Sequence, residues 1–264
     1  MNIIVCIKQV PETSNVRMDE ATGTMVREGQ ESIVNPLDLF AVEAALRLKA
    51  SQGGHVRALS MGPKDAERAV REVIAMGCDA GVLLSNRAFA ASDTHATSYV
   101  LSRAVQTLAP FDLVLTGSRA TDGETGQVGP GIAAFLDLPL CTFVSSVVEV
   151  TDRAITVERS IETGYEACRL PRPCVLSVTN EIGYVRLPTL RGKQAARRTD
   201  LPVWGPEDLG ADGALIGLKG SPTRVVKIAK PVVARTGTRV DARKVGAQAA
   251  ARELADWLED RGLL

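Results

Sequence analysis

Short apolar runs alternate with helical patterns along the first half of the chain. Four such runs, at residues 3–7, 56–61, 81–84 and 113–116, consist mainly of aliphatic and small side chains. Apolar runs of this length are typical of strands that are buried on both faces of a parallel sheet. Each run ends at a polar or glycine-containing segment, and in open parallel sheets the carboxyl ends of the strands are where ligands bind.

Helical patterns fill the intervals between these runs. Asn35 followed by Pro36 favours the start of a helix, which we expect over 37–49. Apolar side chains recur with helical spacing over 64–76, and Asp93 is suited to cap a third helix that ends near residue 108. The alternation predicts an α/β fold with a Rossmann-like, mostly parallel sheet and helices on both of its faces.

The pattern changes after residue 139. Runs rich in β-branched residues follow at 142–150, 154–160, 165–170 and 174–178, with polar turns between them. We expect these runs to extend the same sheet as antiparallel edge strands. An earlier polar segment, 12–33, is interpreted as a small hairpin flap.

The C-terminal part of the chain has a different composition. Residues 200–231 are rich in glycine and proline and show little periodicity, which is typical of an arm that lies on another surface, and a partner subunit is the natural candidate. An alanine-rich helix is expected over 241–264. We therefore divide the chain into an α/β domain, 1–199, and a C-terminal arm with its helix, 200–264.

Composition excludes several classes of function. The 264 residues include 31 Lys and Arg and 31 Asp and Glu, so no overall charge favours nucleic acid or an anionic membrane. No apolar run approaches 18 residues and no signal pattern begins the chain, so we expect a soluble, cytoplasmic protein without membrane insertion. Five cysteines without a C-x-x-C spacing and only two histidines argue against a zinc site.

The most informative stretch is 116–130, which joins a strand to a short helix expected at 132–136. Connections of this kind usually have about 2–6 residues, and this one is roughly twice as long. A helix that follows a glycine-rich loop offers free backbone N–H groups to an anion, and the glycines can take backbone angles closed to other residues. We therefore predict ligand binding here rather than an ordinary connection. The candidate residues are Thr116, Asp122, Gly123, Glu124, Thr125, Gly126, Gln127, Val128, Gly129 and Pro130.

Other candidates lie at or just after predicted strand ends. Asn35 and Asp38 either bind a ligand or cap the helix that follows, and both interpretations stay open. Thr94 and Thr97 share one face of a first helical turn, where hydroxyl and N–H groups can hold a phosphate. The dinucleotide fingerprint, the P-loop and nucleophile–base motifs are absent. The sequence thus predicts a nucleotide site without catalytic groups of its own, and redox chemistry there would be a cofactor's.

Several ordered motifs together resemble one family. The segments 6–11, 34–38, 41–49, 61–63, 75–77 and 122–130 closely resemble the β subunit of electron transfer flavoprotein. The resemblance runs over the whole chain and implies a heterodimer with an α subunit, an adenine-nucleotide-binding domain and an arm that reaches the partner. It also implies a set of cofactor-lining residues: Cys6, Asn35, Pro36, Leu37, Asp38, Met61 and the loop 122–133.

Two branches of this family differ in what the site holds. In one branch AMP is structural and electrons come from acyl-CoA dehydrogenases. In the electron-bifurcating branch an FAD takes a hydride from NADH; one electron goes to ferredoxin or flavodoxin and the other, through the α-subunit FAD, to an acyl-CoA dehydrogenase or a similar partner. Redox activity is then a property of the complex.

The loop 122–130 and the segments 85–89 and 93–98 look like the bifurcating branch, so FAD is preferred and AMP stays the alternative. Gly126 departs from the alanine common in that branch. The segment near 180–188, where a dehydrogenase-docking loop would fall, leaves the dehydrogenase open. A nucleotide-sensing domain of the universal-stress type is a further alternative, but it would not explain the arm.

Overall fold

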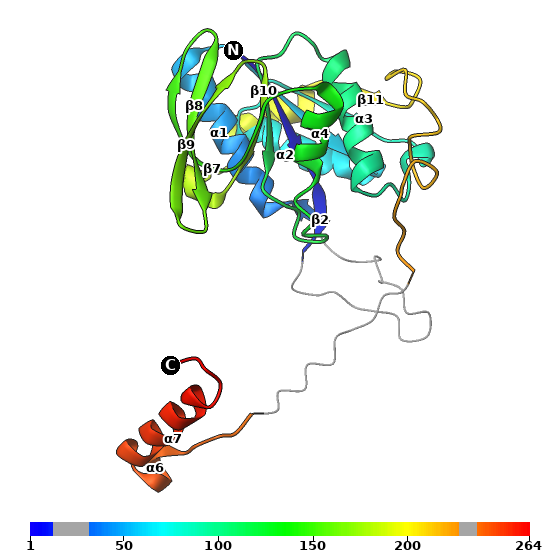
Figure 1. Ribbon diagram of the computed structural model, residues 1–264. Coiled ribbons are helices and arrows are strands. Elements are labelled where there is room, and N and C mark those ends of the chain that lie inside the picture. The colour runs from blue at the N-terminus through cyan, green and yellow to red at the C-terminus, as the bar shows by residue number, and fades with distance from the viewer. Residues whose placement is uncertain (13–31, 227–236) are drawn as a thin grey trace. The chain divides into compact units, whose positions relative to one another are not determined.

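The computed structural model describes residues 1–12, 32–226 and 237–264. Contacts within the chain divide it into two units, Met1–Val226 and Lys227–Leu264. The first unit holds the sheet and is shown in Figure 1 with its elements labelled.

A nine-stranded sheet runs through the first unit, and six of its strands form a parallel array. β7 is also parallel to β10, whereas β8 and β9 are antiparallel to their neighbours. The prediction of a mostly parallel sheet with antiparallel edge strands is therefore confirmed. In spatial order the strands are β11 (Val203–Trp204), β5 (Ala80–Leu84), β4 (His55–Met61), β1 (Asn2–Ile7), β6 (Leu113–Gly117), β10 (Cys174–Val178), β7 (Leu140–Val150), β8 (Ala154–Ile161) and β9 (Gly164–Pro171).

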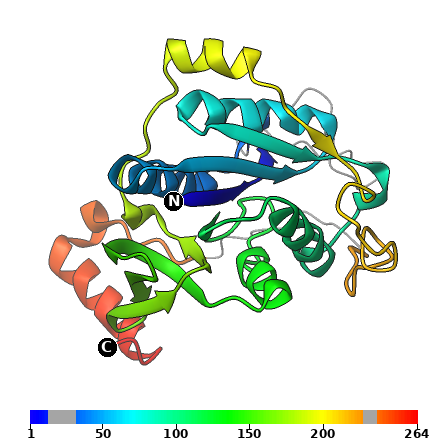
Figure 2. The same cartoon turned by 90° about the horizontal axis from the view of Figure 1, so that it is seen from above.

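Helices cover both faces of this sheet, as Figure 2 shows from above. Side chains alternate between the two faces because successive residues of a strand point in opposite directions. Thus Ile3 and Val5 pack in one core cluster, and Ile4 packs in the other. The first face carries α1 (Pro36–Gln52), α2 (Glu67–Met76) and α5 (Leu190–Arg198), and the second carries α3 (Thr94–Thr107) and α4 (Val128–Leu136). In the described part of the chain, 3₁₀ turns lie between these elements: η2 (Lys64–Ala66), η3 (Arg87–Phe89) and η4 (Asn180–Ile182).

Two details of the second half differ from the sequence prediction. β10 is an interior strand, parallel to β6 and β7, and not an antiparallel edge strand. All five of its residues are buried, which fits a strand covered on both faces. β7 changes partners along its length, with β10 beside its first part and β8 beside the rest, and Phe143 has a φ of 57° at this transition.

A second, two-stranded sheet is formed by β2 (Gln9–Pro11) and β3 (Ser32–Val34), which pair antiparallel. The chain therefore leaves the large sheet after β1, as its sequence predicts. The hairpin flap expected over 12–33 falls mostly on residues 13–31, outside the described residues.

The segment from 203 to 226 belongs to the first unit. β11 pairs with β5 at the sheet edge, and Leu209 and Ile216 are buried in the core cluster beneath α3. This part of the expected arm thus lies on the chain's own sheet. In the second unit the expected single helix is interrupted: α6 (Ala242–Val245) and α7 (Ala247–Glu259) are separated by Gly246, whose φ is 87°. A residue in this left-handed region ends an α-helix.

Within the described part of the chain, no helix combines the length and the apolar character needed to cross a bilayer.

Candidate functional site

The candidate residues meet where the order of the strands reverses. β1 lies between β4 and β6, because the chain first builds one side of the sheet and then crosses to the other. Ligands of open parallel sheets bind in the crevice at such a switch point. Cys6, Met61 and Thr116 lie at or next to the carboxyl ends of these three strands, and the loop after β6 follows at the same edge.

Asn35 holds this loop in place. Its side chain is fully buried; Nδ2 donates to the carbonyl of Arg119 at 2.9 Å, and Oδ1 accepts from the N–H of Thr121 at 3.2 Å. Asn35 precedes α1 but its side chain makes no capping hydrogen bond to that helix. Of the two interpretations open from the sequence, side-chain capping by Asn35 is wrong. Its amide joins two loops of the crevice.

The carboxylate of Asp38 connects the ends of β1 and β6 through hydrogen bonds. Its Oδ2 accepts from the N–H of Lys8 at 2.7 Å, and the N–H of Gly117 also donates to it. Burial raises the pKa of the Asp38 carboxyl from 3.8 to about 7, although the hydrogen bonds from Asn35, Lys8 and Gly117 act in the opposite direction. Gly117 is required here, because a Cβ at this position would lie 2.8 Å from the carbonyl of Leu37.

An ion pair joins the segment after β1 to the loop after β6. Lys8 Nζ lies 2.7 Å from each carboxylate oxygen of Asp122. Both side chains are partly exposed, at 46% and 29%. The loop after β6 is therefore fixed by Asn35 near its start and by Lys8 at its middle.

A third contact fixes the end of this loop. Thr94 Oγ1, in the first turn of α3, donates to Oε1 of Gln127 at 3.1 Å. Gln127 is the N-cap position of α4, so the contact brings the N-terminal ends of two helices together. Ser98 Oγ, one turn further along α3, donates to the carbonyl of Val128 at 3.3 Å. Thr97 lies on the same first turn of α3 and is half-buried. Helix N-termini carry partial positive charge and unpaired N–H groups.

α4 begins four residues earlier than the sequence predicted. Val128, Gly129 and Pro130 therefore form its first turn. Asp93 caps α3 as predicted, because its side chain accepts from the N–H of Ala96. Both helices thus direct their first turns toward the same loop.

Thr116 offers a buried hydroxyl at the start of this arrangement. Its Oγ1 has no hydrogen-bond partner among the described residues, and the residue is 6% exposed. A Cβ at Gly129 would lie 2.7 Å from this oxygen. Unpaired buried hydroxyls are costly, so a polar group that reaches Thr116 would gain a hydrogen bond.

The loop glycines do not all act as expected. Gly126 has a φ of 64°, which confirms the prediction of an unusual backbone angle there. The prediction is wrong for Gly123 and Gly129, because neither has a positive φ; Glu124 takes that conformation instead, with a φ of 53°. Gly129 is needed for its close approach to Thr116, and Gly123 borders open space.

The remaining predicted residues lie near the carboxyl ends of the same central strands. Cys6 is buried, and burial raises the pKa of its thiol to about 12, with the charge of Asp38 adding to the rise. Pro36 and Leu37 begin α1, and Thr125 lies between Glu124 and Gly126 in the loop. Within the described residues no group of three His, Cys, Asp or Glu side chains could hold a metal ion.

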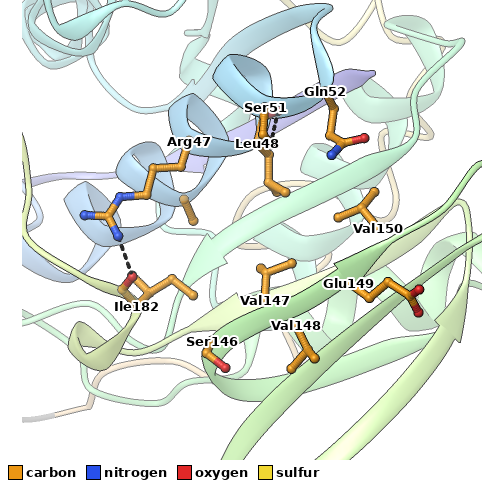
Figure 3. A pocket seen from close by; sticks show the side chains of 11 residues that line it. Arg47, Leu48, Ser51, Gln52, Ser146, Val147, Val148, Glu149, Val150 and Ile182 are labelled. Carbon is orange, nitrogen blue, oxygen red and sulfur yellow. Dashed lines mark hydrogen bonds between the residues drawn. The ribbon is translucent and has the colours of Figure 1, made fainter.

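A separate groove lies away from this edge, between α1 and β7 (Figure 3). Its volume is about 510 Å³ and its floor is largely aliphatic, with Leu48, Val147 and Val150 among the lining side chains. Arg47 closes one end, where its guanidinium donates to the carbonyl of Ile182 at 3.1 Å. It contains none of the residues that the sequence nominated.

Sequence reasoning missed three contributors to the crevice. Lys8 could have been found, because it follows the first strand at the end where ligands collect. Ser98 and the backbone of Arg119 carry no local signal, since both act through contacts with residues far away in the sequence.

Comparison with known proteins shows the family to which the chain belongs. Residues 22–209 match the family model described as "Electron transfer flavoprotein domain". The electron transfer flavoprotein subunit beta of Thermoanaerobacterium thermosaccharolyticum is 44% identical over 90% of this chain and 91% of its own length. Protein FixA of Azotobacter vinelandii is 44% identical over 88% and 84%, and the caffeyl-CoA reductase-Etf complex subunit CarD of Acetobacterium woodii is 41% identical over 88% of each chain. The family match extends over more than half of the chain and the identities exceed 40%, so the chain belongs to the electron transfer flavoprotein family, among its β subunits.

Proposed function

We propose that this chain is the β subunit of an electron-bifurcating electron transfer flavoprotein and that the crevice between β1 and β6 binds FAD. FAD bound there would accept a hydride from NADH and pass on single electrons, one to ferredoxin or flavodoxin and one, through an α-subunit FAD, to an acyl-CoA dehydrogenase or a similar partner. The chain itself binds, orients and shields the cofactor.

The contact between Thr94 and Gln127 is the observation that carries this proposal. AMP has one phosphate, and the first turn of α4 alone offers enough unpaired N–H groups for it. FAD has a pyrophosphate, whose second phosphate needs a second donor set. Because Thr94 Oγ1 lies 3.1 Å from Gln127 Oε1, the positive end of α3 and its threonine hydroxyls lie beside the first set and are suited to the second phosphate.

The residues of the crevice fit the remaining parts of such a cofactor. The unpartnered Thr116 hydroxyl is suited to a phosphate or ribose oxygen, and Asp122 to a hydroxyl or an adenine amino group. Lys8 and the two helix N-termini favour an anion, and Asp38 and Asn35 hold the loops that carry these groups. The pairing with an α subunit follows the family. The proposed roles of an α-subunit FAD, of NADH and of the electron acceptors are based on the resemblance of the loop 122–130 to the bifurcating branch.

A segment after η4 that is anchored by hydrogen bonds and exposes large apolar side chains supports the dehydrogenase partner. Glu43 accepts from the backbone N–H, Nε and Nη2 of Arg186 at 3.1, 2.8 and 3.1 Å, while Arg47 donates to the carbonyls of Ile182 and Tyr184. Burial alone would raise the pKa of Glu43, but the hydrogen bonds from both arginines hold it below its usual range. Next to these hydrogen bonds, three large apolar side chains are exposed: Tyr184 at 93%, Leu187 at 84% and Leu190 at 82%.

Such large exposed apolar side chains mark a protein-binding surface. The relative CarD is named as a subunit of a complex of Etf with caffeyl-CoA reductase, which agrees with a partner that acts on a coenzyme A thioester.

The alternative is a subunit with structural AMP that passes electrons from dehydrogenases without bifurcation. Gly126 is the position of the loop that departs from the bifurcating pattern, so this alternative is kept. The two functions are separated by denaturing the purified heterodimer and counting the nucleotides released. Two FAD per heterodimer support the proposal, whereas one FAD and one AMP overturn it.

Substitutions in α3 test whether this helix contributes to FAD binding. Thr94→Ala removes the contact with Gln127, and we expect it to lower FAD retention of the β subunit several-fold. Thr107→Ala is the matched control, because Thr107 lies at the opposite end of the same helix and donates only to Arg103. Bleaching of the flavin by NADH should fall with FAD content in the first variant and not in the second. Equal retention in both variants would contradict the role of α3.

A further inference from the structure

A segment of the expected C-terminal arm runs along α3, and we call its residues 205–223 the strap. The carbonyl of Leu209 accepts from Nε of Arg103 at 3.2 Å, near the C-terminal end of α3. Further along the strap, the N–H of Asp212 donates to the hydroxyl of Tyr99 at 2.9 Å. The strap therefore follows α3 toward the N-terminus of that helix.

The strap ends on Asp93, the N-cap residue of α3. Ser221 Oγ accepts from the N–H of Asp93 at 2.8 Å. The N–H and Oγ1 of Thr223 both donate to Asp93 Oδ2, at 2.9 and 2.8 Å. The other carboxylate oxygen, Oδ1, caps the helix by accepting from the N–H of Ala96 at 3.1 Å. One oxygen of Asp93 thus holds the helix and the other holds the strap.

A tight turn brings the end of the strap to α3. Gly217 has a φ of 59°, and a Cβ at this position would collide with the carbonyl oxygen of Ala88. Ser221 Oγ donates to the carbonyl of Gly217 at 2.7 Å, which closes the turn. Ile216, just before the turn, is buried in the core cluster beneath α3. Burial and hydrogen bonds together therefore hold the strap against the helix.

The same end of α3 contacts the loop after β6. Thr94, which follows Asp93, donates a hydrogen bond to Gln127 of that loop. Under the proposed function a phosphate of the cofactor lies beside this contact. The carboxylate of Asp93 and such a phosphate would repel each other, because both are negative and both are attracted to the N-terminus of α3.

Hydrogen bonds restrain the charge on Asp93. Burial alone would raise the pKa of this carboxyl, but the hydrogen bonds from Ala96 and Thr223 hold the pKa below its usual range, so Asp93 is ionised at neutral pH. Donors to a carboxylate stabilise its negative charge and fix its orientation. Without the hydroxyl of Thr223, Oδ2 would keep a single donor and the carboxylate could turn more easily.

We propose that Asp93 and Thr223 are positioning residues for the anionic part of the cofactor. Thr223 holds the carboxylate of Asp93 on the strap, so that the first turn of α3 stays capped and can face a phosphate without a mobile negative charge beside it. This inference rests on the proposed function, because it needs a phosphate next to α3. Thr223 lies 130 residues after Asp93, so part of the expected arm contributes to the cofactor site of its own chain.

The coupling between strap and cofactor must act in both directions. If the closed strap favours cofactor binding, the bound cofactor stabilises the closed strap by the same factor. The N–H of Thr223 reports on this closure, because it is free to exchange with solvent when its hydrogen bond to Asp93 opens. Hydrogen exchange at Thr223 should therefore slow when the cofactor binds.

The first test measures FAD retention in the purified heterodimer with the complete β chain. Thr223→Val keeps the shape of the side chain and removes the hydroxyl, and loss of this hydrogen bond should lower FAD retention about fivefold. Thr223→Ser keeps the hydroxyl and should retain FAD as the wild type does. Thr199→Val is the matched control, because the hydroxyl of Thr199 donates to Ala195 at the end of α5, on the other face of the sheet.

Two results of this comparison overturn the proposal. One is equal FAD retention in Thr223→Val and Thr199→Val, which would show that the hydroxyl on the strap has no effect on the crevice. The other is an equal loss of FAD in Thr223→Val and Thr223→Ser, which would show that the loss does not depend on the hydroxyl.

A substitution of Asp93 tests whether its charge is the cause. Asp93→Asn keeps a side chain that caps helices and removes the negative charge. We expect this variant to bind FAD at least as tightly as the wild type, and Thr223→Val should have little further effect in its background. If Thr223→Val lowers FAD retention by the same factor in both backgrounds, the role of the carboxylate is wrong.

Hydrogen exchange separates this inference from the proposed function. FAD should slow exchange at Thr223 about fivefold in the wild type. A heterodimer that releases two FAD but exchanges at the same rate with and without FAD would overturn this inference alone. If the heterodimer releases AMP in place of the second FAD, the proposed function fails, and unchanged AMP retention in Thr223→Val would then overturn this inference as well.

Discussion

Lys8 and Asp122 form an ion pair across the carboxyl ends of two central strands, β1 and β6, with Lys8 Nζ 2.7 Å from both carboxylate oxygens. Lys8 follows β1 and Asp122 lies on the loop after β6, so the ion pair spans the point where the order of the strands reverses. The same two side chains are suited to the anionic and the hydroxyl-bearing parts of a nucleotide. The pair therefore fixes the loop and, under the proposed function, lies where a nucleotide would bind.

Replacing Lys8 by Ala should weaken nucleotide binding more than it weakens the fold. The pair is partly exposed, and such pairs contribute at most about 1 kcal/mol to stability. Loss of a cation beside a phosphate costs a comparable amount in affinity, or about fivefold. We expect nucleotide content after dialysis to fall about fivefold and more steeply at high ionic strength, while the Tm changes little.

Lys64→Ala is the matched control, since Lys64 is exposed at the start of η2 and makes no ion pair among the described residues. Equal nucleotide retention in the two variants would contradict the role of Lys8 in nucleotide binding.

Asp38 should make stability depend on pH in an unusual direction. Burial raises the pKa of this carboxyl from 3.8 to about 7, so the folded chain holds its proton more tightly than the unfolded chain. The stabilisation is fully present below about pH 4 and is lost as the pH rises to about 7, with a total of about 4 kcal/mol at most. Urea unfolding at several pH values measures it.

Asp38→Asn should remove this pH dependence, because the amide cannot ionise. Asp112→Asn is a control of the opposite sign: burial alone would raise the pKa of Asp112, but hydrogen bonds from Asn2 and Arg172 hold it below the usual range. The stabilisation by Asp112 is present above about pH 4 and is lost only in acid. A wild-type protein without a decline in stability between pH 4 and 7 relative to Asp38→Asn would contradict the assignment.

The sequence predicted individual helices and strands, because each has its own pattern of apolar residues. It did not predict contacts between elements that are far apart in the chain. The spacing of Ala69, Val70 and Val73 predicted α2, because one turn of a helix returns to the same face. β10 was misplaced because it follows three hairpin strands in the chain, although its five buried residues are typical of a central parallel strand.

The same difference between local patterns and distant contacts applies to the candidate site. The loop after β6 was identified by its glycines and polar residues, but its three fixed points depend on Lys8, Asn35 and Thr94, which lie 114, 84 and 33 residues away. The segment 203–226 looked like a free arm because glycine and proline hide its periodicity. Leu209 and Ile216 are nevertheless buried in the chain's own core.

The exposed segment after η4 should determine how fast electrons reach the dehydrogenase. Leu187 is 84% exposed next to Arg186, which donates hydrogen bonds to Glu43. Apolar anchors of this kind contribute about 1–2 kcal/mol to binding when truncated, or roughly a tenfold change in kcat/KM. We expect Leu187→Ala to lower electron transfer to the dehydrogenase by that factor, with nucleotide content and Tm unchanged.

Leu218→Ala separates this effect from a general loss of apolar surface, because Leu218 is 57% exposed in a loop that packs beneath α3. Glu43→Gln should lower electron transfer less than Leu187→Ala does. It weakens the hydrogen bonds between Glu43 and Arg186 but leaves the side chain of Leu187 in place. Stopped-flow reduction of an oxidised acyl-CoA dehydrogenase by the reduced heterodimer measures all three variants. The same rate in Leu187→Ala and Leu218→Ala would show that docking uses another surface of the heterodimer.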